Sequence, residues 1–114
     1  MSIDPATLAE LNALDDSGGL LSELVDLFAS GTPDRIARLR AAVMVADADA
    51  VVREAHALKG SCGTLGAVEL LALATQMELR AKASDLSSAT AQLELIETAF
   101  GSALLELQAL VMRG

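Results

Sequence analysis

The sequence has no tryptophan, no tyrosine and only two phenylalanines, although 53% of its 114 residues are hydrophobic. A core built from this chain must therefore consist of leucine, valine, isoleucine, methionine and alanine. These side chains suit helix-on-helix packing, whereas the aromatic and β-branched runs that favour strands are scarce. No segment alternates with a period of two for long enough to predict a strand. We therefore expect an all-α protein.

Cysteine and histidine each occur only once, as Cys62 and His56. A single cysteine excludes an internal disulfide and any cysteine-based metal cluster. A single histidine cannot build a histidine-rich metal site. We therefore expect the chain to hold no metal and no cofactor of its own.

Basic residues are also few, with eight lysines and arginines against sixteen aspartates and glutamates, which gives a net charge of −8. Nucleic-acid binding requires a basic patch, and an anionic lipid surface would repel this chain. Charges interrupt every window of about 18 residues, so no membrane span is expected, and the N-terminus does not resemble a signal peptide. We expect one domain over residues 1–114, a cytoplasmic monomer whose partner is a protein.

Apolar residues recur at helical spacing along most of the chain. Asp4-Pro5 predicts the start of a short helix near 5–14. A second apolar stripe is interrupted by Ser30-Gly31-Thr32-Pro33. Either Thr32 caps a new helix here, or one long helix is kinked at Pro33. The sequence does not decide between these two alternatives.

Three more helices are expected after these. Asp47-Ala48-Asp49 offers cap residues for the helix that contains His56. The next helix lies near 67–83, and Ser84-Asp85 is expected to cap the last one. Short loops make successive helices antiparallel. The expected fold is an up-down four-helix bundle with a short extra N-terminal helix.

The stretch Ala55–Ala67 is the most unusual in the chain, because it holds the only histidine, the only cysteine and three glycines at 60, 63 and 66. Apolar residues run through it at helical spacing. A glycine inside a helix costs about 1 kcal/mol relative to alanine. We infer that something must come close to this helix.

At about 100° per residue, Lys59, Gly60 and Gly63 share a face with His56. The opposite face is predicted to be core and contains Val51, Ala55, Leu58, Cys62 and Leu65. A neutral imidazole is a good nucleophile near pH 7, and a lysine one turn away could stabilise a dianionic phosphoryl group. Taken singly, these are an ordinary surface histidine, a solvated lysine and helix-packing glycines. Cys62 is interpreted as a small buried hydrophobe rather than a nucleophile.

The segment His56–Ser61 resembles the signature of histidine-containing phosphotransfer (HPt) domains. The resemblance continues through Gly63, Leu65, Gly66 and Ala67, and extends over most of the chain. It implies a helical bundle that carries a phosphoryl group in multistep two-component signalling. Such a protein is a carrier without its own ATP site rather than an enzyme.

The resemblance also implies a role for each residue of the site. His56 would take the phosphoryl group on Nε2 from an aspartate of one response-regulator receiver domain and pass it to another. Lys59 would neutralise the phosphoryl charge, and Gly60 and Gly63 would give the receiver access. Glu78 fits the place of a family residue that hydrogen-bonds Nδ1–H, although an ordinary exposed carboxylate is the alternative. The implied partners are receiver domains, which would supply Mg²⁺, and a hybrid histidine kinase.

Val52 is an apolar residue on the same face, one turn before His56. Together with Leu20, Leu21 or Leu24 it could form a docking patch, unless those leucines belong to the core. Two other functions stay open. One is a helical adaptor that binds a receiver or kinase without being phosphorylated. The other is the phosphorylated input domain of a chemotaxis-type kinase, although Met1 and a helix that runs almost to Gly114 favour a complete small protein.

Overall fold

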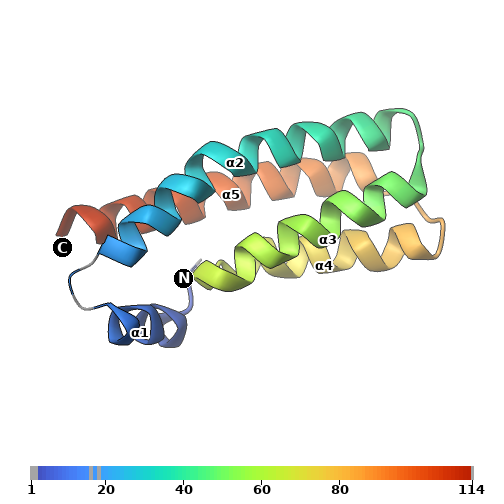
Figure 1. Ribbon diagram of the computed structural model, residues 1–114. Coiled ribbons are helices and arrows are strands. Elements are labelled where there is room, and N and C mark those ends of the chain that lie inside the picture. Colours follow the sequence, from blue (N-terminus) through green and yellow to red (C-terminus); the bar gives the residue numbers. More distant parts are fainter. Residues whose placement is uncertain (1–2, 16, 18, 114) are drawn as a thin grey trace.

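The structure is a computed structural model, and it describes residues 3–15, 17 and 19–113. The described residues form a helical bundle, so the predicted all-α fold is confirmed (Figure 1). Its elements, in chain order, are α1 (Pro5–Leu14), α2 (Gly19–Met44), α3 (Ala48–Leu65), α4 (Val68–Lys82) and α5 (Ala89–Arg113).

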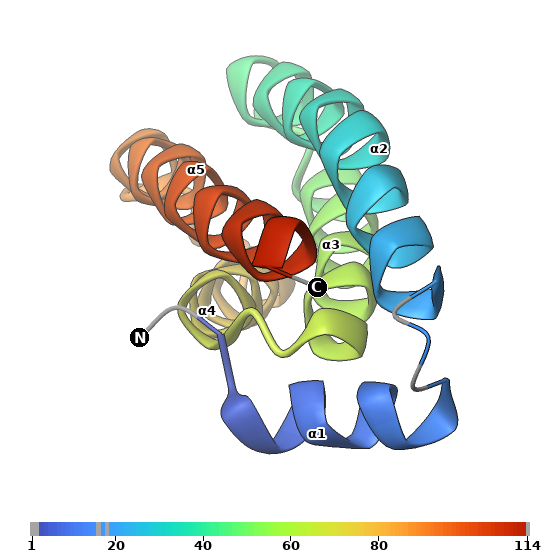
Figure 2. The ribbon, with the colours of Figure 1, turned by 90° about the vertical axis from the view of Figure 1, so that its left-hand side faces the viewer.

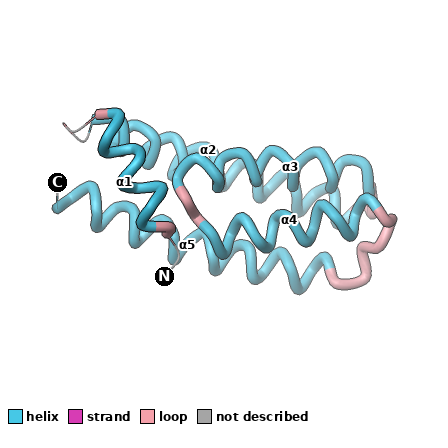
Figure 3. Tube along the Cα trace, turned by 90° about the horizontal axis from the view of Figure 1, so that it is seen from below, coloured by secondary structure: helices cyan, strands magenta, loops and turns pink. Residues whose placement is uncertain are grey.

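The four long helices run alternately up and down and pack as a ring. α2 packs against α3 and α5, and α4 packs against the same two helices from the other side (Figures 1 and 3). Each helix contributes large side chains to the shared core, and four that are at most 1% exposed are Leu39, Leu58, Met77 and Leu107. The two phenylalanines of the chain meet between α2 and α5, where the rings of Phe28 and Phe100 have centroids 5.1 Å apart. Burial of this aliphatic core drives the helices together.

Tight turns connect α2 to α3, α3 to α4 and the end of α4 to the following loop. Each turn has one residue in the left-handed region, namely Ala46 (φ 55), Gly66 (φ 70) and Ser84 (φ 58). The next N–H in each turn donates to a carbonyl five residues back, as in Asp47 to Ala42, Ala67 to Cys62 and Asp85 to Arg80. This is the Schellman arrangement, and it reverses the chain within a few residues.

The expected start of the last helix was wrong. α5 begins at Ala89, whereas Ser84 ends α4 in the left-handed conformation. Asp85 does not cap α5, because its side chain accepts the N–H of Ser87 at 3.1 Å within the connecting turn. Short polar side chains serve turns as readily as helix N-termini, and a sequence pattern does not separate these two uses.

α2 is continuous from Gly19 to Met44 with Pro33 inside it, which decides the question that the sequence left open. A proline in a helix removes one backbone donor and usually costs about 3 kcal/mol. Pro33 itself is exposed, but Thr32 beside it and Phe28 and Ile36 one turn on either side are buried. This tertiary packing holds the helix together across the proline.

The short helix α1 lies across one end of the bundle (Figure 2). The side chain of Asp4 accepts the N–H of Ala6, so the predicted cap is confirmed. The backbone N–H of Asp4 donates to the carbonyl of Gly66 at 2.7 Å, and Ile3 forms an isolated bridge with Ala67. The N-terminal segment is thereby attached to the turn that follows α3.

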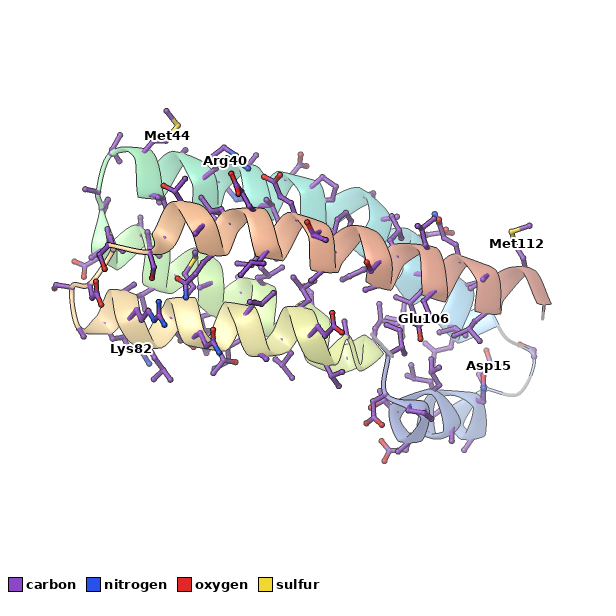
Figure 4. All side chains as sticks on the ribbon, turned by 180° about the vertical axis from the view of Figure 1, so that it is seen from behind. Asp15, Arg40, Met44, Lys82, Glu106 and Met112 are labelled. Carbon is purple, nitrogen blue, oxygen red and sulfur yellow. The ribbon has the colours of Figure 1, made fainter. Side chains whose placement is uncertain are left out.

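α5 includes a segment, Ala89–Met112, that is long and apolar enough to span a membrane by length and composition, with a mean hydropathy of 1.4. The distribution of charges in the sequence had predicted no segment of this kind. In the bundle one stripe of α5 packs against α2 and α4. Met112 and Met44 project from opposite ends of the molecule (Figure 4).

Candidate functional site

The face of α3 that carries His56 is open to solvent, as the helical spacing predicted. The opposite face is at most 2% exposed at Val51, Ala55, Leu58, Cys62 and Leu65. The His56 side chain is 71% exposed. Gly60 and Gly63 are exposed, and among the described residues no atom outside their own helical turn lies within 4 Å of where a Cβ would stand. A partner can therefore approach the imidazole closely.

Glu78 reaches the histidine from the neighbouring helix α4. Its side chain is only 5% exposed, and its Oε2 lies 2.9 Å from Nδ1 of His56. Its Oε1 accepts a hydrogen bond from Nζ of Lys59 at 2.8 Å. The structure thus brings together three residues to which the sequence had given roles, and it places Glu78 beneath the ring rather than at the surface.

The environment of Glu78 lowers the pKa of its carboxyl from the ordinary value. The hydrogen bond from Lys59 contributes most, and the bond with His56 and the charges of Lys59 and Lys82 act in the same direction, while burial opposes them. Glu78 is therefore ionised at neutral pH. Because an ionised carboxylate can only accept, the proton of a neutral His56 ring belongs on Nδ1. The lone pair is then left on Nε2.

Lys82 is a site residue that the sequence analysis missed. Its Nζ lies 3.6 Å from Oε2 of Glu78, and its side chain is 57% exposed. Lys82 follows Glu78 by four residues on α4, at the spacing that places two side chains next to each other on a helix. That spacing was visible in the sequence. Figure 4 labels Lys82 at the C-terminal end of α4.

The residues expected to form a docking patch lie in different places. Val52 is half-buried beside the site. Leu21 is buried in the core and offers little surface to a partner. The ion pair between Arg38 and Glu54 shows which levels of α2 and α3 lie side by side. At a rise of about 1.5 Å per residue, this alignment places Leu20 roughly 24 Å along α2 from the level of His56. The structure therefore does not bring Leu20 and Leu21 to the histidine.

Cys62 is fully buried, and burial raises the pKa of its thiol to about 12. A thiol in this state is neither a nucleophile nor a metal ligand, so its interpretation as a small core residue is confirmed. In the described ranges of the chain, no three histidine, cysteine, aspartate or glutamate side chains gather in a way that could hold a metal ion.

Comparison with known proteins identifies this arrangement of helices and side chains. The Hpt domain family matches residues 23–111, which include α3, α4 and all of the site residues described above. The chain belongs to the Hpt domain family. Histidine-containing phosphotransfer protein B (HptB) from Pseudomonas aeruginosa PAO1 has a similar crystal structure, with a TM-score of 0.91 and 27% sequence identity. The match covers 99% of this chain and 96% of that one.

The comparison with curated proteins gave no match. Family membership and the structural match show that this Hpt protein is a histidine phosphotransfer carrier of phosphorelays, a carrier rather than a kinase.

Proposed function

We propose that His56 accepts a phosphoryl group on Nε2 from the aspartyl phosphate of one receiver domain and passes it to an aspartate of another. One observation carries this proposal. A buried, ionised carboxylate is bonded to Nδ1 of an imidazole whose side chain is 71% exposed. Such a ring presents its free lone pair to the partner in a fixed orientation.

The proposed transfer is a displacement at phosphorus. Nε2 of His56 attacks the phosphorus, an N–P bond forms, and the bond from phosphorus to the aspartate oxygen breaks. The aspartate leaves as a carboxylate. The ring keeps its proton on Nδ1 and becomes cationic, and the Oε2 of Glu78 at 2.9 Å stabilises this new charge. The second transfer reverses these steps onto another receiver.

Two lysines stand near the phosphoryl group in this proposal. Lys59 is hydrogen-bonded to Glu78, but an ammonium group has three donors and can bind a phosphoryl oxygen at the same time. Lys82 has a more exposed side chain and only a long contact with the same carboxylate. Lys59 therefore supplies a fixed charge and Lys82 a movable one. The receiver would supply Mg²⁺ and the acidic pocket around its aspartate.

The test is transfer from phosphorylated receivers. A panel of receiver domains from the source cell, each phosphorylated with acetyl phosphate, is incubated with the wild-type chain and with His56→Gln. The wild type should acquire a label that is lost in acid and retained in base. His56→Gln should acquire none, because His56 is the only histidine.

Two outcomes would contradict the proposal. Label on His56→Gln would place the phosphoryl group on another residue. A wild-type chain that binds receivers but takes no label from any of them would be an adaptor instead.

A further inference from the structure

α5 exposes more apolar surface than packing in the bundle requires. Its segment Ala89–Met112 is apolar enough to span a membrane by length and composition, yet only 22% of its most apolar 18-residue window is buried. A helix that is apolar because it belongs to the core would be mostly buried. The side chains of Leu95, Leu105 and Met112 are instead 55%, 71% and 87% exposed. The core of the bundle therefore does not account for the composition of this helix.

The exposed residues of α5 form a continuous stripe without charge. They follow one another at alternating intervals of three and four residues, as Leu95, Thr98, Ser102, Leu105, Ala109 and Met112. At about 100° per residue, this stripe lies opposite Ile96, Ala103 and Leu107, which are at most 1% exposed and face the core. Such spacing is typical of the seam between two helices that pack side by side, and here the seam is roughly 26 Å long. The stripe thus has the pattern of a docking face for another helix.

The charges around this stripe are all negative. Residues 83–112 contain Asp85, Glu94, Glu97 and Glu106 but no lysine or arginine. By the same helical spacing, Glu94 and Glu106 stand on opposite edges of the stripe. A second copy of α5 would bring carboxylates against carboxylates, and an anionic lipid surface would also be repelled. A helix with lysines or arginines on both sides of an apolar seam matches these edges in charge.

The stripe faces away from the histidine. α3 and α5 lie at opposite corners of the ring, because each packs against α2 and α4, and their backbones do not come into contact within the described part of the chain (Figure 2). His56 projects from the outer side of α3, and its side chain is 71% exposed. A helix that docks on the outer side of α5 therefore leaves the imidazole open to a receiver domain.

We propose that the outer face of α5, the stripe from Leu95 to Met112 with its acidic edges, docks an amphipathic helix of a partner protein. The docked helix carries aliphatic side chains at heptad spacing, with lysines or arginines on both sides of them. It holds the carrier in place while His56 stays accessible. The inference goes beyond the proposed function, because docking on α5 requires no phosphoryl transfer.

A designed helical peptide, three heptads long, is the probe. It has leucines at the a and d positions and lysines at e and g, whose mutual repulsion keeps the peptide from pairing with itself. A matched peptide has glutamates in place of the lysines. Fluorescence anisotropy measures the binding of each labelled peptide to the wild type, Leu105→Lys and Leu27→Lys. Leu27 is the control residue because its exposure is similar, 66% against 71%, but it lies on α2.

The lysine peptide should bind the wild type, and the glutamate peptide should not. Leu105→Lys should raise the Kd of the lysine peptide about tenfold or more, as expected for a residue at the centre of an interface. Leu27→Lys adds the same charge elsewhere and should change this Kd by less than about twofold. Glu94→Gln should also raise the Kd, whereas Glu23→Gln, an exposed control on α2, should not. Bound peptide should leave the labelling of His56 by phosphoramidate, a small phosphoryl donor, unchanged.

Failure of the lysine peptide to bind the wild type would overturn the inference. Equal binding to the wild type and Leu105→Lys, or equal losses in Leu105→Lys and Leu27→Lys, would overturn it as well. Slower labelling of His56 with peptide bound would show that the peptide covers the histidine instead of α5, which has the same consequence.

Two further measurements address the other possible occupants of this face. Binding of the wild type, but not of Leu105→Lys, to phosphatidylcholine vesicles would show that a lipid surface covers α5 and would overturn the inference. So would a dimer that Leu105→Lys dissociates, because a second copy of the chain would then cover the face. Each of these results leaves the proposed function intact, since none of them bears on phosphoryl transfer to His56.

Discussion

The buried carboxylate of Glu78 contacts three side chains that carry nitrogen. His56 and Lys59 are bonded to it at 2.9 and 2.8 Å, and Lys82 is 3.6 Å away. Burying a carboxylate is unfavourable unless it is hydrogen-bonded and paired with positive charge. These three partners keep Glu78 ionised, and the ionised group in turn fixes the proton on Nδ1. Under the proposed function, the orientation of the exposed imidazole thus depends on a residue that is itself buried.

The pH dependence of stability should reveal this charge. The lowered pKa of Glu78 means that the folded state binds a proton less readily than the unfolded chain, whose carboxyl has a pKa near 4.5. The contribution of ionised Glu78 to the stability of the fold is therefore complete above the unfolded pKa. It is lost as pH falls through the lower pKa of the folded state. Glu78→Gln should be less stable than wild type by about 1–3 kcal/mol near pH 7, and the difference should shrink near pH 3.

Urea unfolding of both proteins at the two pH values measures this difference. Other carboxyl groups with lowered pKa values, such as Asp15 and Asp85, are present in both proteins and cancel. A difference that stays constant with pH would show that the carboxyl of Glu78 has the same pKa in the folded and unfolded states. A wild type that loses stability relative to Glu78→Gln as pH rises would show that Glu78 is not ionised in the folded protein.

The two lysines should contribute unequally to stability. Lys59 makes a short bond to the buried carboxylate, so Lys59→Ala should cost about 1–3 kcal/mol. The ammonium group of Lys82 lies farther from the carboxylate, and its side chain is more exposed. Lys82→Ala should therefore lower the free energy of unfolding by only about 0–1 kcal/mol. Lys59→Ala should also shorten the lifetime of the phosphohistidine more than Lys82→Ala does. Urea unfolding and decay of the label measure the two effects, and equal losses from both variants would contradict the distinction between a fixed and a movable charge.

Helical spacing was enough to place His56, Lys59 and Gly60 on one open face of α3 and Cys62 in the core. The resemblance to Hpt domains supplied Glu78. Neither source indicated that Glu78 would be only 5% exposed, because its burial depends on how α4 is rotated against α3, and the pattern of a single helix does not fix that rotation. The contact of Lys82 with Glu78 lies within α4, and its i,i+4 spacing could have predicted it.

At the scale of elements, the turns between helices use the left-handed conformation without always using glycine. Gly66 has φ 70 and Ala46 has φ 55 in equivalent positions at the ends of α3 and α2. A Cβ on Gly66 would also come within 2.8 Å of the Cβ of Thr7 on α1. Gly66 therefore serves both the end of α3 and the attachment of α1.

Reciprocal substitutions should have opposite effects. Gly66→Ala should lower the unfolding free energy by at least about 1–2 kcal/mol, because of left-handed strain and the contact with Thr7. Ala46→Gly should raise it by about 0.5–1 kcal/mol, because it relieves the same strain. Chemical denaturation followed by circular dichroism measures both. A loss of stability in Ala46→Gly would show that Ala46 is not strained.

Element boundaries were predictable where the cap chemistry is unambiguous. Asp4-Pro5 marked the start of α1, and Asp47 caps α3 through the N–H of Ala50 at 3.1 Å. The sequence misplaced the start of α5, because Ser84 and Asp85 form a turn instead. It also left Pro33 undecided, because the outcome depended on the burial of Thr32 and Ile36 against other helices.

At the scale of the whole molecule, the bundle is elongated, with extents of 44 × 20 × 20 Å and a radius of gyration of 14.5 Å. Helical periodicity and short loops predicted its up-down arrangement. A cavity of about 350 Å³ between α2 and α3, which Leu24, Gly31 and Thr64 help to line, was not predictable, because it depends on the spacing of two helices.

The expectation of a monomer follows from a site that needs no second copy of the chain. Small-angle X-ray scattering should give a radius of gyration close to that of the single chain, 14.5 Å, with a small increase from hydration. The value should not change with protein concentration. A rise toward the size of a dimer, accompanied by loss of phosphotransfer on dilution, would show that the chain acts as an oligomer.

The most direct measurement is NMR correlation of phosphorus with the imidazole nitrogens in the phosphorylated protein. With Glu78 bonded to Nδ1 at 2.9 Å, the phosphorus should couple to Nε2 of His56, and the proton should stay on Nδ1. Coupling to Nδ1, or phosphorus on a carboxylate or hydroxyl group, would contradict the role given to His56 and Glu78.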